Sequence, residues 1–130
     1  MIVADTNILV RFVVDDDVAQ ADRAEAVLRS GPVRLLSTVL LELEWVLRSS
    51  YRLPRPKVLM ILRGLTALPM VEVEDADRVA RALDGFEAGL DFADALHLAA
   101  AGEGEVFVTF ERHLIRDAGR LGFAVPVQEP

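Results

Sequence analysis

The chain has 130 residues, of which 52% are hydrophobic and 27% charged, with a formal net charge of −7. This length fits one domain, 1–130, and this composition is typical of a folded globular protein rather than a disordered chain. A count of 0 cysteines excludes a disulfide framework and a thiolate zinc site, which is consistent with a reducing compartment. No apolar run is long enough to span a bilayer and no basic-then-apolar leader precedes Asp5. We therefore expect a cytoplasmic protein without membrane contact.

Hydrophobic spacing predicts strands that alternate with helices along the whole chain. Short apolar runs predict strands at residues 2–5, 33–37, 70–73, 106–110 and 124–127. Segments with helical spacing predict helices at residues 7–14, 19–30, 38–51, 57–68, 75–89, 91–101 and 112–122. Such alternation favours parallel pairing, so we expect an α/β fold. Its expected form is a three-layer α/β/α sandwich around a mainly parallel five-stranded sheet.

Acidic side chains follow two of the predicted strands. Asp5 ends the first strand, which we expect to be buried, and Glu111 follows the fourth. Ligands of parallel sheets bind beyond the carboxyl ends of the strands, so the two acids meet at one rim if these strands are neighbours. Each acid also has a structural explanation. Asp5 could accept hydrogen bonds from the amides of the next helix, and Glu111 in a first helical turn interacts favourably with the helix dipole.

The predicted helix at 38–51 carries two acids on a surface that is apolar nearly all round. Glu44 precedes Arg48 by four residues, which is the spacing of a helical ion pair. Glu42 has no basic residue at this spacing, so we expect it to be a buried carboxylate that needs a partner from elsewhere. A metal ion is one such partner.

Further acids lie at expected helix starts. Asp91 is expected to cap the helix at 91–101, and Asp94 follows in a box-like relation, so spacing alone favours a structural role for both. His97 could pair with Asp94, although a single histidine on an alanine-rich helix is usually a core residue. The acidic run 15–17 is expected to be a solvated loop that caps the next helix, and Thr6 or Asn7 to cap the first.

Four segments together resemble the PIN-domain family, and specifically the toxin ribonucleases of the VapC type from bacterial and archaeal toxin–antitoxin pairs. The segments are VADTNILVR, LLELEWVLR, DFADALHLAAA and VFVTFERHL, in the expected order, and the resemblance extends from residue 2 to about residue 125. It implies that the family's four catalytic and metal-binding acids fall on Asp5, Glu42, Asp94 and Glu111. The fourth position usually carries aspartate, so Glu111 is a departure. Its extra methylene moves the carboxylate, which favours a water-mediated contact or a contact with only one of two ions.

The same resemblance implies accessory residues and a cofactor. Asp91 resembles an accessory acid, and Thr6 and Thr109 flank the site in the family. The implied activity is that of a Mg²⁺- or Mn²⁺-dependent endoribonuclease with Asp5 as the central ligand. Hard divalent cations prefer oxygen ligands, and a cation relieves the repulsion between converging carboxylates.

The implied partners are RNA, a second copy of the chain in a homodimer, and a cognate VapB-like antitoxin. The negative net charge of the chain argues against nucleic acid as a partner, unless the acidic residues are concentrated at one place and hold cations. Arg112 is the first candidate for RNA contact, and further candidates are Arg11, Arg48, Arg52, Arg55, Lys57 and Arg116. The antitoxin would lay an apolar helix against the helices at 38–51 and 57–68, with Trp45 as an anchor, and direct a basic side chain toward the acids.

Other classes of protein fit less well. A phosphoacceptor receiver domain needs a lysine after the fifth strand, and AVPVQEP contains none. A haloacid-dehalogenase-type phosphatase needs a second aspartate where Asn7 stands. A catalytically weak PIN-like module that only binds RNA or a protein partner stays open as the alternative, because of Glu111.

Overall fold

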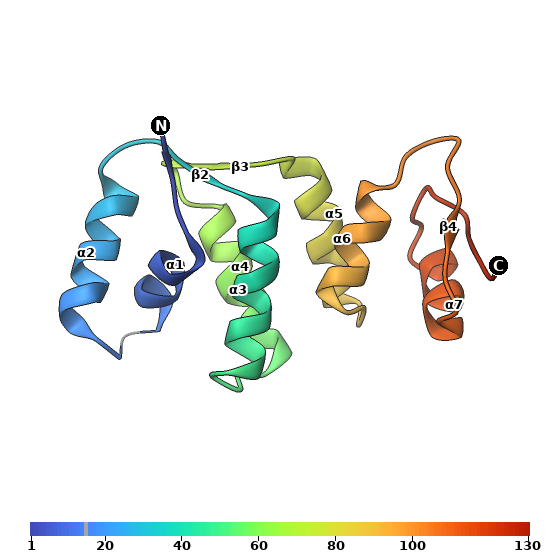
Figure 1. Cartoon of the computed structure of the whole chain (residues 1–130), viewed down its shortest axis with the longest axis horizontal. Helices are drawn as coiled ribbons and strands as arrows, with labels where there is room; N and C mark the ends of the chain where they lie inside the picture. Colours follow the sequence, from blue (N-terminus) through green and yellow to red (C-terminus); the bar gives the residue numbers. More distant parts are fainter. Residues whose placement is uncertain (15) are drawn as a thin grey trace. The chain divides into compact units, whose positions relative to one another are not determined.

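Figure 1 shows the computed structural model of the chain, in which every residue except Asp15 is described. The chain divides into two compact units, Met1–Ala76 and Asp77–Pro130, and each is described by itself. Within these described residues, no helix is both long enough and apolar enough to cross a membrane.

The first unit contains three parallel strands and the helices that connect them. Its elements are β1 (Ile2–Val3), α1 (Thr6–Val13), α2 (Val18–Arg29), β2 (Val33–Leu35), α3 (Ser37–Ser49), α4 (Arg55–Thr66) and β3 (Val71–Val73). The sheet order is β1-β2-β3, with Val33 opposite both Ile2 and Val71. The central strand β2 supplies the core residues Val33 and Leu35, which are fully buried because the strand is paired on both sides.

Strand β1 is exposed, and the prediction that it is buried was therefore wrong. Ile2 and Val3 are 41% and 50% exposed. The physical reason is that β1 pairs with β2 on one side alone within the described residues of the first unit, so its other side is not covered in that unit. The first buried residue after β1 is Ala4, and Asp5 follows it directly.

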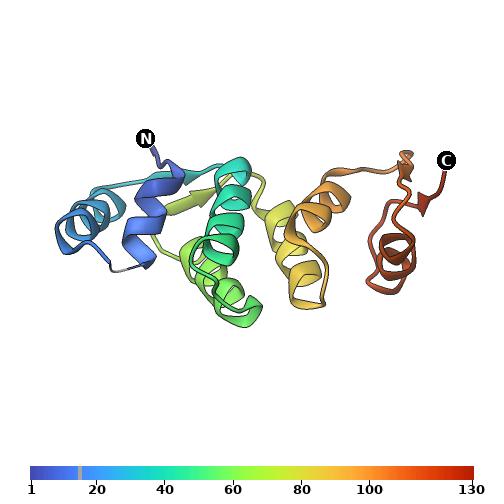
Figure 2. The same cartoon turned by 60° about the horizontal axis from the view of Figure 1, so that its bottom comes forward.

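The helices of the first unit contact each other in pairs. Helices α1 and α2 lie side by side, and so do α3 and α4, in both views (Figures 1 and 2). Helix α1 also contacts α3, although the two are separated in the sequence by α2 and β2. This contact brings the residues that follow β1 next to the middle of α3.

The second unit contains the helices and strands of the C-terminal part. Its elements are α5 (Ala76–Glu87, which begins at the unit boundary), α6 (Phe92–Ala100), β4 (Phe107–Val108), α7 (Arg112–Arg120) and β5 (Val127–Gln128). The rings of Phe86 and Phe92 pack edge to face, with centroids 5.7 Å apart. Gly89 joins α5 to α6 with a φ of 113°, a conformation that a residue with a Cβ atom rarely adopts. Strands β4 and β5 pair in parallel, with Phe107 opposite Val127.

The predicted order of strands and helices and the α/β class are confirmed, and all pairings are parallel. Among the described residues, β1, β2 and β3 form one parallel sheet in the first unit, and β4 and β5 form a parallel pair in the second. Each strand is two or three residues long, which is shorter than predicted. Apolar runs continue beyond the paired residues because burial does not require a ladder hydrogen bond. Val125, for example, is buried outside the strands.

Candidate active site

Asp5 has a carboxylate that takes no part in capping α1. It occupies the N-cap position, but its side chain makes no capping hydrogen bond. Its backbone carbonyl accepts the N–H groups of Ile8 at 3.1 Å and Leu9 at 3.5 Å. The prediction that Thr6 or Asn7 is the cap was therefore wrong, because the helix begins at Thr6. Capping does not explain the Asp5 carboxylate, which is free to bind a ligand.

Asp5 and Glu42 line the same open pocket of about 290 Å³ in the first unit. The pocket lies between the start of α1 and the middle of α3, the two helices that contact each other. Its other lining residues are Thr6, Asn7, Val10, Arg11 and Val46. Thr6 is 6% exposed and is thus a nearly buried part of the wall. The structure therefore brings together the first two predicted acids and one predicted accessory threonine.

The prediction that Glu42 is buried was wrong, and the buried acid of α3 is Glu44. Glu42 is exposed, whereas the Glu44 side chain is only 2% exposed. Arg48 donates from Nε to both Glu44 carboxylate oxygens, at 3.2 and 3.1 Å, which confirms the predicted ion pair. Residues two apart on a helix do not face the same side. Glu42 is therefore an exposed carboxylate that shares a pocket with Asp5, and burial places no demand on it for a partner.

Asp91 and Asp94 lie together at the start of α6 in the second unit. The Asp91 side chain accepts a hydrogen bond from the Asp94 backbone N–H at 3.4 Å, which confirms Asp91 as the cap. Burial raises the pKa of the Asp94 carboxyl, and the charge of Asp91 raises it further. His97 and His113 oppose this pKa shift, and Glu111 adds to it. Asp94 thus lies in a partly buried position that disfavours the charged form of its carboxyl group.

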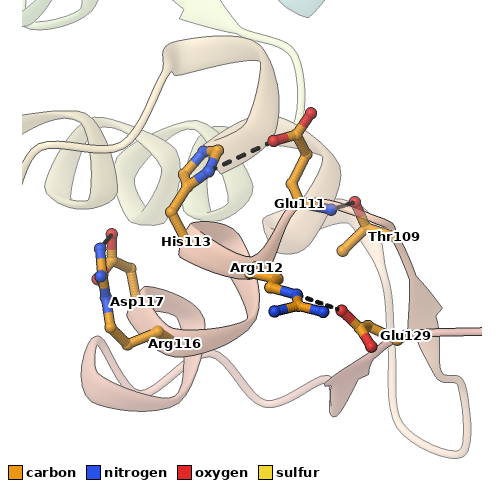
Figure 3. A network of polar contacts seen from close by, with 7 residues as sticks. All are labelled: Thr109, Glu111, Arg112, His113, Arg116, Asp117 and Glu129. Carbon is orange, nitrogen blue, oxygen red and sulfur yellow. Dashed lines mark hydrogen bonds and ion pairs between the residues drawn. The ribbon is translucent and has the colours of Figure 1, made fainter.

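Glu111 is held at the start of α7 by its backbone (Figure 3). Its N–H donates to the Thr109 hydroxyl at 3.1 Å, and its side chain makes no capping hydrogen bond. The Glu111 carboxylate lies 3.4 Å from Nδ1 of His113. His113 was not among the predicted site residues. The available signal was its position two residues after Glu111, since Glu111 precedes α7 as its N-cap residue and His113 lies in the first turn.

Arg112 and His97 have surroundings that the sequence did not indicate. Arg112 donates from Nε to Glu129 at 3.1 Å and is 89% exposed (Figure 3), so its RNA contact stays a prediction. The expectation that His97 is a core residue was wrong, because the side chain is exposed. Its ring stacks on Phe107 with centroids 6.4 Å apart, at the surface of the second unit.

The donor atoms of these acids suit a hard divalent cation. Among the described residues, no three acidic or histidine side chains form a group that could hold a metal ion on their own. Each unit nevertheless offers carboxylate oxygens, from Asp5 and Glu42 in the first and from Asp94 and Glu111 in the second, and Mg²⁺ is usually held by a few carboxylates together with water. Burial is the main cause of the raised pKa of Asp94 and the charge of Asp91 is the second, and a nearby cation would favour the charged carboxylate against both. The donor type of these side chains, carboxylate oxygen, therefore matches the ligand preference of such an ion.

Comparison with known proteins identifies the family. Residues 2–120 match the PIN domain family, and the match runs through both compact units. The chain therefore belongs to the PIN-domain family, whose members are generally nucleases and typically use divalent metals. Searches among curated proteins and among solved structures returned no match.

Proposed function

We propose that this chain is a Mg²⁺- or Mn²⁺-dependent endoribonuclease whose catalytic, metal-binding acids are Asp5, Glu42, Asp94 and Glu111. The observation that carries the proposal is the pocket lined by both Asp5 and Glu42. Within the described part of the first unit, neither carboxylate is engaged in an ion pair or a hydrogen bond. Membership of the PIN-domain family supports a nuclease. The proposal treats residues 1–130 as one PIN domain in which the four acids act together.

The acids and the threonines have separate roles in this proposal. A divalent cation, when bound, lowers the pKa of an attacking water and neutralises charge on the departing oxygen. Asp5 is the central ligand, and Glu42 and Asp94 complete the oxygen set. Glu111 contributes through water or to one ion only, and Thr109 holds its backbone in place by accepting the Glu111 N–H. Asp91 caps α6 and adds negative charge next to Asp94.

A cleavage assay with a matched control tests the proposal. Purified protein is incubated with structured RNAs in Mg²⁺, in Mn²⁺ and in chelator, beside Asp5→Asn and Asp22→Asn. Asp22→Asn removes the same charge from an exposed position of α2 that lies outside the pocket. We expect cleavage by the wild type and Asp22→Asn with metal only, and none by Asp5→Asn. Equal cleavage in every lane would reveal a contaminating nuclease and overturn the proposal.

We further propose that the chain is the toxin of a VapBC-type pair, a homodimer neutralised by a VapB-like antitoxin. Two large apolar side chains on neighbouring helices support a partner surface, since Trp45 of α3 is 56% exposed and Met60 of α4 is 58% exposed. Expression without antitoxin is expected to slow growth, and normal growth counts against a toxin. Trp45→Ala is expected to weaken the antitoxin complex, measured by calorimetry, while light scattering of the free protein tests the homodimer.

A catalytically weak PIN-like module, which only binds RNA or a protein partner, is the alternative. The observation that favours it is Glu111, whose carboxylate lies against His113 and whose type departs from the usual aspartate. Glu111→Asp distinguishes the two functions. Higher activity of this variant would show that the glutamate weakens a working site. Absence of cleavage by both proteins, with RNA binding retained, would favour the binding module.

A further inference from the structure

A second pocket of about 440 Å³ lies between α1 and α2. It is lined by Asn7, Ile8, Arg11, Gln20, Arg23, Ala24 and Val27. Two of these residues are cationic, two carry amides, and none is acidic. This composition contrasts with the chain as a whole, which has a net charge of −7.

Helical spacing separates the pocket into an apolar floor and a polar rim. Residues 7, 8 and 11 form one stripe of α1, and residues 20, 23, 24 and 27 form the facing stripe of α2. Ala24 is buried, and Ile8 and Val27 are half-buried. Asn7, Gln20 and Arg23 are exposed, so the groups that donate hydrogen bonds surround an apolar surface.

The two arginines of the rim are available to an anion. Arg23 has no ion-pair or hydrogen-bond partner among the described residues. Arg11 pairs with Asp16 at 2.9 Å, but both side chains are well exposed, at 36% and 46%. Exposed pairs of this kind contribute about 0–1 kcal/mol, so a phosphate competes with Asp16 at little cost.

The arginine pocket adjoins the pocket that contains Asp5 and Glu42. Asn7 and Arg11 line both, so the two pockets share a wall on α1. The two pockets are therefore neighbours on the surface of the first unit, with Asn7 and Arg11 common to both.

We propose that the α1–α2 pocket binds the nucleotide next to the cleaved phosphodiester, with Arg11 and Arg23 on backbone phosphates. The apolar floor of Ile8, Ala24 and Val27 lies under the base, as apolar surfaces do in proteins that bind single strands. This inference rests on the proposed ribonuclease function and deepens it by naming positioning residues for the substrate. It also explains how an acidic chain holds RNA, because the positive charge is local.

RNA binding without metal tests the pocket separately from the acids. The probe is a labelled, unstructured oligoribonucleotide of about twelve nucleotides, and its fluorescence anisotropy is measured in chelator at several salt concentrations. We expect Arg23→Gln and Arg11→Gln each to weaken binding about fivefold. Each lost phosphate contact reduces the slope of log affinity against log salt by about 0.7.

Arg29→Gln is the matched control. Arg29 lies on the same helix, outside the pocket, and is paired with Glu25 at 2.8 Å. The affinity of Arg29→Gln for the oligoribonucleotide is expected to stay within about twofold of that of the wild type. Glutamine preserves the helix propensity, and no phosphate contact is lost. The proposal is overturned if Arg23→Gln and Arg29→Gln bind the oligoribonucleotide with equal affinity. It is also overturned if the wild type does not bind the oligoribonucleotide in chelator. Circular dichroism confirms that all variants are folded.

A parallel cleavage assay distinguishes failure of the pocket from failure of the proposed function. Metal-dependent cleavage by the wild type together with normal RNA binding by Arg23→Gln rejects the pocket and leaves the nuclease intact. Weakened binding by Arg23→Gln together with no cleavage by the wild type supports the pocket and rejects the nuclease. Binding of Mn²⁺ alone by Arg23→Gln is expected to equal that of the wild type, because Arg23 does not line the pocket of the acids.

Discussion

At the scale of the residue, the raised pKa of Asp94 predicts a stability that depends on pH. Burial is its first cause and the neighbouring Asp91 its second. The folded state binds this proton more tightly than the unfolded state, whose pKa lies near 3.8. The resulting stabilisation is complete below that pH and is lost as the pH rises through the raised pKa.

Asp94→Asn, which cannot ionise, is therefore expected to melt at a higher temperature than the wild type at pH 7 in chelator. The difference should shrink as the pH falls toward 3.8, and calorimetric melting curves at both pH values measure it. Asp77→Asn is the control. Asp77 lies in the first turn of α5, where negative charge is favourable, so its removal should not raise the melting temperature. A wild type that melts above Asp94→Asn at pH 7 would contradict the prediction.

The Glu44–Arg48 ion pair predicts that replacing Arg48 lowers the free energy of unfolding. Arg48→Met leaves a carboxylate that is 2% exposed without the cation on its oxygens. Removing one partner of a buried pair costs about 3–5 kcal/mol, and we expect about 2–3 here because Arg48 is 41% exposed. Urea unfolding measures the loss. Arg29→Met, which breaks the exposed pair with Glu25, is expected to cost less than about 1 kcal/mol. Equal losses for the two variants would show that Glu44 finds another partner.

At the scale of the element, two helical glycines predict opposite tolerance to a methyl group. A Cβ added at Gly64 in α4 meets nothing within 4 Å, so Gly64→Ala is expected to stabilise the protein by about 0.5–1 kcal/mol through helix propensity. A Cβ at Gly85 in α5 lies 3.1 Å from the Phe123 ring and 3.2 Å from the Ala95 side chain. Gly85→Ala should therefore stabilise the protein less than Gly64→Ala does, or destabilise it. Thermal unfolding of both variants compares them, and a larger gain at Gly85 would contradict the packing described here.

At the scale of the whole molecule, the proposed metal site predicts stabilisation by a divalent cation. An ion that binds only the folded state at 100 times its Kd adds about 2.7 kcal/mol. Mn²⁺ is expected to raise the melting temperature of the wild type and of Asp22→Asn. It should leave the melting temperatures of Asp5→Asn and Asp94→Asn unchanged, because each variant removes one carboxylate from the proposed set of four. Full stabilisation of Asp94→Asn by Mn²⁺ would show that the four acids do not act together.

The sequence predicted the elements well because their signals are local. The apolar spacing of α5, the Asp91 cap of α6 and the Glu44–Arg48 spacing in α3 each involve residues within a few positions of one another. Burial was predicted less well. Glu42 and Glu44 stand on the same apolar helix, and periodicity alone did not tell which of them the contact with α1 and α4 would cover.

The sequence by itself determined the order of strands and helices, the α/β class and the acids that resemble those of the PIN family. Hydrophobic periodicity and motif spacing carry these properties along the chain. Only the tertiary structure decided that the Asp5 side chain takes no part in capping and that Glu44 rather than Glu42 is buried. It also decided that Arg23 lines a pocket next to the one with Asp5 and Glu42. These properties depend on contacts between α1, α2 and α3, and such contacts are set by packing between segments distant in sequence rather than by spacing within one.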